Sequence, residues 1–235
     1  MAALLCVVSV NAQKKVALYD STKVEQLKEV VVKGVRAQKN APYAIANIKK
    51  AELNEFSKTG KELPFLFSKT PGVMAWSENG LGTGTTYMRI RGAADSRINV
   101  TLDGVPLNSP EDQCVFWANM NSYGSLLGSV QIQRGVGSST NGDGAFGGTV
   151  ALSSAIPDQK PSLEVSGSYG SFNTFNVGGK LSTGLLWNHL ILDGAYHETH
   201  TDGFIHGTSG RSGSYYGGLT WLGDNIQIRY KNITT

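Results

Sequence analysis

The feature that most constrains this chain is a strict two-residue alternation of apolar and polar side chains that begins at residue 162. Leu163, Val165 and Tyr169 fall on one face of an extended strand, whereas Glu164 and Ser166 fall on the other. Successive side chains of a strand point to opposite faces, so each such run predicts a strand with one apolar face. The pattern returns at 175–182, 215–221 and 226–231. About five candidate strands follow from this part of the chain.

Two kinds of sheet carry such a pattern: a soluble sheet that packs one face on a core, and a membrane barrel with lipid outside and a polar lumen. Alternation alone does not separate them. Runs of about ten residues, aromatic residues near the run ends and connections that alternate between short and long favour the barrel. The connections near 185–188 and 223–225 are short and would face the periplasm, whereas the one at 197–214 is long and would face outward. No apolar run reaches the roughly 20 residues of a spanning helix, so a membrane crossing would use strands.

Residues 41–157 mix two kinds of local signal. Helix-like apolar spacing occurs at 48–56 and 62–69, and the second of these segments ends at Pro71-Gly72. Short strand-like runs, separated by Gly, Asn and Pro, lie at 86–91, 98–102, 130–134 and 149–152. This mixture predicts a small α+β domain.

Composition excludes one class of partner. The formal net charge is only +3, and Lys and Arg are scattered among acidic residues without a basic stripe. A nucleic-acid-binding surface is therefore not expected. Charged residues make up 17% of the chain, below the roughly 25% of soluble domains, and 29 of the 235 residues are glycine. Both values favour strands and tight turns over helices.

The first 40 residues divide into two segments. Residues 1–12 are apolar and end at a small residue, which indicates a signal peptide. The segment lacks a positively charged start, so a natural start upstream of Met1 is one interpretation. Its removal would leave Cys114 as the single cysteine and exclude an intramolecular disulfide. Residues 13–40 are polar except for one short apolar stretch and are predicted to form a flexible tether.

Several motifs then occur in a fixed order. They are LKEVVVKGVR at 27–36, LPFLFSKTPGV at 63–73, YMRIRG at 87–92, RINVTLDGVPL at 97–107, MNSYGSLLGSVQIQRGVGSSTNGDGAFGGTVALSS at 120–154 and GSYGSFNTFNVGGKLS at 167–182. Each motif is weak alone, but in this order and spacing the chain resembles the TonB-dependent receptor family along nearly its whole length. The resemblance implies an α+β plug domain followed by antiparallel transmembrane β-strands of an outer-membrane β-barrel of about 22 strands.

On this basis the chain would supply a plug at 41–157 and the first strands of an incomplete barrel at 158–235. The protein would lie in the outer membrane of a Gram-negative bacterium, in contact with its lipid. The glycine-rich stretch at 135–148 lacks the Gly-Lys-Ser/Thr of a phosphate-binding loop. No catalytic constellation is found in the sequence, and neither an enzyme activity nor a cofactor is expected.

The resemblance also implies an energy-coupling segment at Glu29, Val30, Val31 and Val32. In the family this segment pairs as an added strand with the periplasmic domain of TonB, the protein that links the receptor to the inner-membrane motor. β-branched residues favour the extended backbone that such pairing needs. The competing interpretation is an ordinary first strand of the plug.

Three arginines are candidates for plug–barrel contacts. In the family, arginines in motifs such as RIRG and QRG meet acidic groups of the barrel wall, and Arg89, Arg91 and Arg134 occupy these motifs here. A planar guanidinium can bind a carboxylate through two hydrogen bonds in such a setting. The alternative is that they are solvated arginines on strands.

Ligand contacts are expected on plug segments that face outward, at 77–84, 93–97 and 109–119. The candidate residues in them are Asn79, Asp95, Arg97, Asp112 and Trp117. His197, His200 and His206 fall in the expected long outer connection, where they would bind a metal ion or be ordinary polar loop residues.

The sequence thus predicts a ligand-gated importer that uses TonB for energy. Family members that import glycans often carry an extra domain before the coupling segment, and only about 15 residues separate Ala12 from Leu27 here. A small metal chelate, such as a siderophore–iron complex or cobalamin, is therefore the favoured ligand. The alternative is a noncatalytic adhesion or structural barrel.

Overall fold

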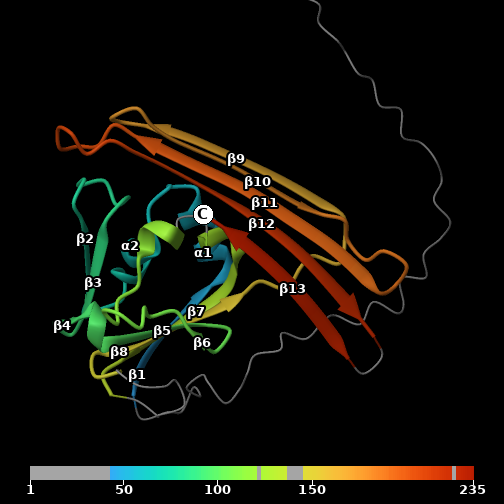
Figure 1. Ribbon diagram of the computed structural model, residues 1–235, viewed down its shortest axis with the longest axis horizontal. Helices are drawn as coiled ribbons and strands as arrows, with labels where there is room; N and C mark the ends of the chain where they lie inside the picture. Colours follow the sequence, from blue (N-terminus) through green and yellow to red (C-terminus); the bar gives the residue numbers. More distant parts are fainter. Residues whose placement is uncertain (1–42, 121–122, 137–144, 224–225) are drawn as a thin grey trace, which may run out of the picture.

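The computed structural model describes residues 43–120, 123–136, 145–223 and 226–235. The chain forms two parts that lie against each other: a compact α+β unit built from β1 to β8, and a long five-stranded sheet built from β9 to β13 (Figure 1). We call the second part the meander sheet. The signal peptide, tether and coupling segment predicted within residues 1–40 lie outside the described residues.

The α+β unit is organised around a mixed sheet in the order β1-β7-β8-β5-β6. Its strands are β1 (Ala44–Lys49), β7 (Leu127–Arg134), β8 (Gly148–Ser154), β5 (Ile98–Leu102) and β6 (Val105–Pro106). The pair β5·β8 is parallel, and the other neighbours are antiparallel. Ile132, Val150 and Leu152 are 0–1% exposed, so this sheet provides the centre of the core.

Helices and a small second sheet complete the core of this unit. The helices are α1 (Lys50–Ser57), α2 (Leu63–Phe67) and α3 (Tyr123–Leu126), with 3₁₀ turns η2 (Asp95–Arg97) and η3 (Trp117–Met120). The small sheet contains β2 (Val73–Ser77), β3 (Thr86–Ile90) and β4 (Ala93–Ala94). Pro64 lies in the first turn of α2, where its missing N–H costs nothing. Leu53, Leu66 and Phe67 are at most 1% exposed and anchor α1 and α2 in the core.

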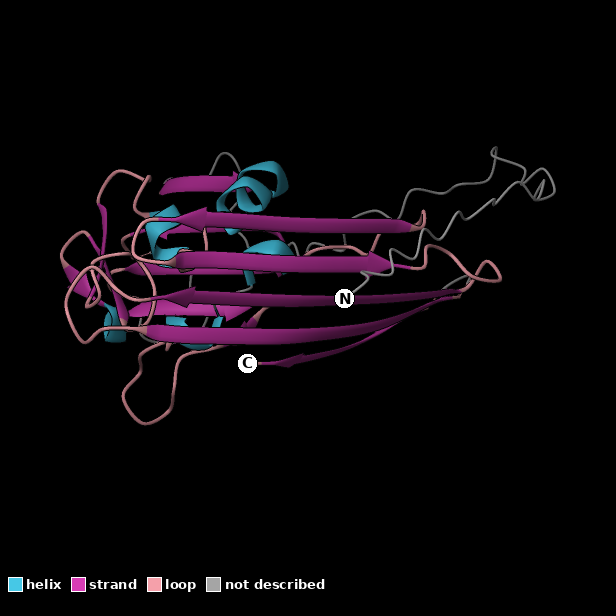
Figure 2. Ribbon diagram, turned by 90° about the horizontal axis from the view of Figure 1, so that it is seen from above, coloured by secondary structure: helices cyan, strands magenta, loops and turns pink. Residues whose placement is uncertain are grey.

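The meander sheet contains five antiparallel strands in chain order, as the alternation predicts. They are β9 (Ser162–Gly170), β10 (Thr174–Ser182), β11 (Leu190–Thr201), β12 (Gly210–Leu222) and β13 (Gln227–Thr234). Figure 2 shows these strands as long ribbons that run side by side, with the shorter elements of the α+β unit next to them.

The meander sheet turns its apolar face away from the α+β unit. Leu163, Val165 and Tyr169 are 73–77% exposed, whereas the inward Asn176 and Thr199 are 2–3% exposed. A soluble sheet would do the opposite, because apolar surface is buried against a core. Outward apolar and inward polar faces are those of a barrel wall with lipid outside, so this observation decides between the two interpretations of the alternation.

The connection predicted at 197–214 is shorter in the structure. Strand β11 continues to Thr201 and β12 begins at Gly210, so the connection spans 202–209. The alternation persists through polar residues here, because His197 and Thr199 face inward while Glu198 and His200 face outward. The alternation of apolar with polar residues in the sequence therefore ends before strand β11 does. Within the described residues, no helix is long and apolar enough to cross a membrane.

Candidate functional site

The turn between β2 and β3 is shaped by one buried side chain, Asn79. Its Oδ1 accepts hydrogen bonds from the Leu81 N–H at 2.9 Å and the Ser77 hydroxyl at 3.0 Å, and its Nδ2 donates to the Thr83 hydroxyl. Asn79 is 6% exposed. These bonds replace the backbone pairing that the turn lacks and hold the turn in one shape.

This turn touches the 202–209 connection of the meander sheet. The Phe204 N–H donates to the Asn79 carbonyl at 3.2 Å, and Gly80 lies against the Phe204 ring. Gly80 has φ +73°, a conformation that glycine adopts without strain. The contact brings residues more than a hundred positions apart to the same end of the molecule.

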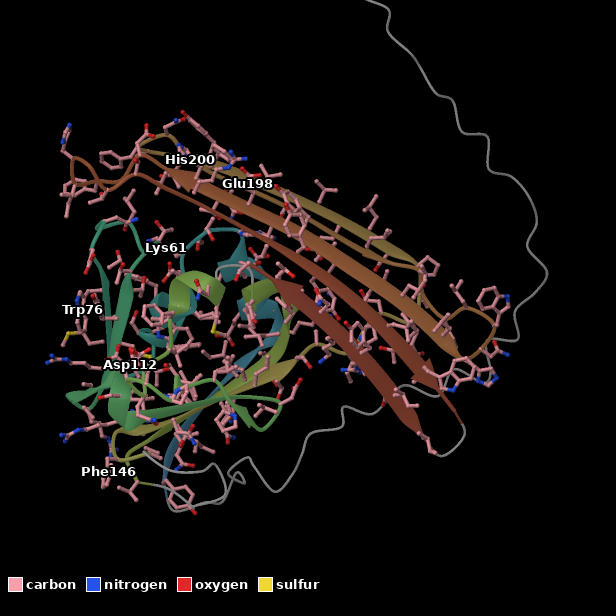
Figure 3. All side chains as sticks on the ribbon, viewed as in Figure 1. Lys61, Trp76, Asp112, Phe146, Glu198 and His200 are labelled. Atoms are coloured by element: carbon pink, nitrogen blue, oxygen red, sulfur yellow. The ribbon has the colours of Figure 1, made fainter. Side chains whose placement is uncertain are left out.

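A polar pocket of about 440 Å³ opens at this end. One wall comes from the β2–β3 turn and residues 118–119, and the other from β11, β12 and the connection between them. Threonine hydroxyls line both walls, at Thr83 and Thr85 on one side and Thr199 and Thr201 on the other. Figure 3 labels Lys61 of the α+β unit below the end of the meander sheet that carries Glu198 and His200. We call this cavity the outer pocket.

Glu62 belongs to the outer pocket and is not among the ligand-contact residues predicted from the sequence. It is 1% exposed, its N–H donates to the Gly82 carbonyl at 2.8 Å, and its Oε2 has no hydrogen-bond partner among the described residues. Burial raises the pKa of this carboxyl to about 7; the nearby Thr86 hydroxyl and the Gly84 N–H offset part of that effect. Thr86 Oγ1 itself makes no hydrogen bond of normal geometry.

Arg211 is the one positively charged residue among the described lining residues of the outer pocket, and its side chain binds Glu198, which faces outward from β11. Both Nε and Nη2 of Arg211 lie 2.6 Å from Glu198 Oε1, so its charge is already paired. Glu78 also lines the pocket and accepts a hydrogen bond from the Tyr87 hydroxyl at 2.8 Å. The pocket is therefore hydrophilic and, on its described walls, negative in balance.

The structure distributes the predicted ligand contacts over different places. Asn79 lines the outer pocket, and parts of the ranges 77–84 and 109–119 meet there. Asp112 is exposed and accepts the Cys114 N–H at 2.9 Å within its own turn. Trp117 is 2% exposed and packs edge-on against Phe67 at 5.7 Å between ring centroids. The structure thus places Trp117 in the core, where its apolar ring is buried, rather than on a ligand-facing surface.

The predicted segment 93–97 lies at the other end of the β2–β3 hairpin. Ser77 pairs with Thr86 beside the turn, whereas Arg89 pairs with Ala94 at the far end. Asp95 and Arg97 therefore do not join Asn79 around one ligand. Sequence proximity to β3 was not sufficient to predict which end of the strand they would occupy.

The three histidines are not brought together. His197 points inward and is 6% exposed, with Nε2 3.3 Å from the Thr199 hydroxyl. His200 lies on the opposite face of β11, 3.2 Å from Asp202 Oδ1, and His206 lies in the connection. No group of three or more His, Cys, Asp or Glu side chains that could hold a metal ion occurs in the part of the chain that the structure describes. The expectation of a histidine metal site in an outer loop therefore fails, because two of the histidines belong to a strand.

The candidate arginines make local contacts in the described part of the chain. Arg134 Nη1 donates to the Pro71 carbonyl at 2.7 Å, and the Arg89 guanidinium lies over the Trp76 ring at 5.5 Å. Arg91 has φ +51° and lies beside Gly135. Their contact with acidic groups of a barrel wall stays a prediction.

Other side chains join the α+β unit to the meander sheet. Lys231 of β13 bonds Asp103 Oδ2 at 3.1 Å and also the Ser154 hydroxyl. The Asn176 amide donates to the Ser57 carbonyl at 2.9 Å, and the Ser168 hydroxyl donates to the Lys58 carbonyl at 2.8 Å.

These two carbonyls lie at the C-terminal end of α1, where helix carbonyls lack intrahelical partners. The sheet thus caps the helix. These residues could not be predicted from the sequence, because neutral hydroxyl and amide groups on a strand give no specific signal.

Comparison with known proteins places this geometry in a wider group. Residues 37–149 match the family TonB-dependent Receptor Plug Domain. The chain is 28% identical over 186 residues to Lactoferrin-binding protein A of Neisseria meningitidis. The match covers 70% of this chain and 19% of that protein.

Two solved structures share the fold. The ferripyoverdine receptor of the outer membrane of Pseudomonas aeruginosa matches with a TM-score of 0.65 and 17% identity, over 81% of this chain and 24% of that one. The Ferric-Catecholate import receptor Fiu of E. coli matches with a TM-score of 0.62 and 14% identity, over 81% and 26%. The chain spans about a fifth to a quarter of the length of these relatives.

Proposed function

We propose that the chain belongs to the TonB-dependent receptor family of the outer membrane, whose plug-domain model matches residues 37–149, and that the protein actively imports a scarce small ligand. The α+β unit is the plug of this family, and the meander sheet is part of its barrel wall. The observation that carries the proposal is the seating of the plug on the polar face of a sheet whose other face is apolar. This arrangement blocks a lumen that a ligand would have to cross.

A metal chelate, such as a siderophore–iron complex, is the proposed ligand. The names of the solved relatives describe a ferripyoverdine receptor and a ferric-catecholate import receptor. The outer pocket supports the proposal because it lies at the end of the plug that contacts the 202–209 connection. Ligand binding there would have to favour one state of the plug through differential affinity, because equal affinity for both states shifts nothing.

TonB is the proposed energy-coupling partner, and Glu29–Val32 is the proposed point of attachment. A peptide spanning Lys23 to Gln38 should bind purified periplasmic TonB domain, and the Val31→Pro peptide should not, because proline removes a strand N–H donor. A Val31→Thr peptide, which keeps the N–H and the β-branch, is the matched control. If the wild-type and proline peptides bind TonB equally well, or if neither binds, coupled import is contradicted and the adhesion alternative is favoured.

A further inference from the structure

The outer pocket has a charge balance that selects among ligands. Its described walls contribute two carboxyl groups, Glu62 and Glu78, and one guanidinium, Arg211. Arg211 is bound by Glu198 at 2.6 Å through two of its nitrogens, so its charge is compensated outside the pocket lining. The uncompensated charged groups of the lining are therefore the two carboxyl groups, of which Glu62, with a pKa of about 7, is ionised in only part of the molecules at neutral pH.

Hydrogen bonding in the pocket points the same way. Glu62 is 1% exposed and its Oε2 has no partner among the described residues, although a buried carboxylate oxygen normally accepts at least one hydrogen bond. The other polar groups are the hydroxyls and amides of Thr83, Asn119 and Thr199, with further Ser and Thr side chains. Hydroxyls adapt as donors or acceptors, whereas an ionised carboxylate only accepts. A ligand that donates hydrogen bonds therefore fits the fixed part of the lining.

From this geometry we propose that the outer pocket selects a chelate that carries a positive charge and donates hydrogen bonds, and that it rejects polyanionic chelates. The inference rests on the proposed function, because it names the ligand class of the same receptor. A cation near the two carboxyls is attracted in a partly desolvated cavity, whereas a polyanion meets like charge there. The anionic catecholate chelates are thus disfavoured, and chelates with a pendant ammonium group are favoured.

A matched pair of chelates tests the charge directly. Ferrioxamine B, a ferric hydroxamate with a free ammonium group, and its N-acetylated form differ at that group. A ferric tris-catecholate serves as the polyanion, with the E. coli ferric-catecholate import receptor as its binding control. Dissociation constants are measured by calorimetry on the full-length receptor in detergent. We expect ferrioxamine B to bind roughly tenfold tighter than the acetylated form, and the tris-catecholate not to bind.

Variants locate the effect in the pocket. Glu78→Gln changes an exposed side chain and leaves the core untouched, and Glu62→Gln keeps the shape of the buried one. Each should reduce the difference between ferrioxamine B and its acetylated form. Glu55→Gln, on the exposed face of α1, removes the same formal charge away from the pocket and should leave the difference unchanged.

Three results would overturn the inference: equal or tighter binding of the tris-catecholate, a charge preference that survives both pocket variants, or binding of none of the three chelates. The TonB peptide measurement stands apart from all of them. If the peptide binds TonB while the chelates behave in one of these ways, import remains and only the ligand class falls. If the chelates bind as expected while the peptide does not, coupled import falls and the pocket chemistry remains.

Discussion

At the scale of single residues, Glu62 is the group whose chemistry departs furthest from the ordinary. Its pKa is about 7 in the folded protein, above the ordinary value of 4.5, because burial disfavours the charged carboxylate. The folded state therefore binds more protons than the unfolded state between these two values. The contribution of the protonated Glu62 carboxyl to the free energy of unfolding is fully present below pH 4.5 and is lost as the pH rises through about 7. Glu78 and Arg211, the other charged groups that line the same pocket, do not contribute to the shift.

We predict that the thermal midpoint of the full-length receptor falls between pH 5 and pH 8, and that Glu62→Gln removes most of this fall. The shift corresponds to about 2–3 kcal/mol in favour of the variant at pH 8. Glu78→Gln, an exposed carboxyl of the same pocket, is the control and should keep the wild-type pH dependence. A pH profile of Glu62→Gln that matches the wild type would contradict the assignment.

The sequence could not reveal Glu62, and the reason is physical. Residues 62–69 carry helix-like spacing, so Glu62 reads as a solvated residue at the start of a helix. Its burial arises from Gly82, from the β2–β3 turn and from strands that follow more than a hundred residues later. Trp117 shows the converse case: an aromatic residue on a predicted outer loop is drawn into the core by Phe67. Local patterns carry no information about such distant partners.

At the scale of elements, strands were easier to predict than their ends. Alternation is a local property, so β9, β10 and β12 were recognisable from their apolar files. Strand β11 was expected to end near His197 because its outer portion alternates polar with polar. Strand β1 was missed, since its six residues pair with β7, more than eighty positions away, and run directly into α1.

The outward face of β9 provides a test of orientation. Val165 is 74% exposed on the face that we assign to lipid. Val165→Arg should lower the amount of folded receptor in the outer membrane, because an arginine facing lipid costs roughly 2–4 kcal/mol at the bilayer midplane. Val165→Leu, which keeps an apolar side chain, should assemble normally. Heat-modifiable migration of outer-membrane fractions reports the folded amount, and normal assembly of the arginine variant would argue against a lipid-facing β9.

At the scale of the whole molecule, the α+β unit and the meander sheet are joined by hydrogen bonds between polar groups. Asp103 joins the two parts through its bond to Lys231 and is also bound by Ser154 of its own unit. Burial alone would raise the pKa of this carboxyl, but hydrogen bonds from Ser154 and the charge of Lys231 bring it below the ordinary value. The stabilisation is therefore present above the pKa of 3.8 of a free carboxyl and is lost as the pH falls through the lower folded value.

Asp103→Asn should loosen the plug on the wall without unfolding it. The asparagine keeps the shape but loses the charge that attracts Lys231, which costs about 1 kcal/mol for a partly exposed pair. Hydrogen exchange of the β5 and β8 amides in the full-length receptor should accelerate accordingly. Asp112→Asn, in an exposed turn, is the control. Unchanged exchange in Asp103→Asn would show that the other polar contacts hold the plug by themselves.

The strand order of the meander sheet also bears on how the protein is made. Among the described residues, each strand from β9 to β13 pairs only with its neighbours in the chain. Every such pairing closes a short loop and can form soon after its second strand is available. The sheet of the plug is different, because β1 pairs with β7 and β5 pairs with β8, and these partners lie far apart in the sequence. The meander sheet can therefore form one hairpin at a time. The pairings of the plug span the larger part of its sequence and should close more slowly, so the wall would assemble while the plug is still folding.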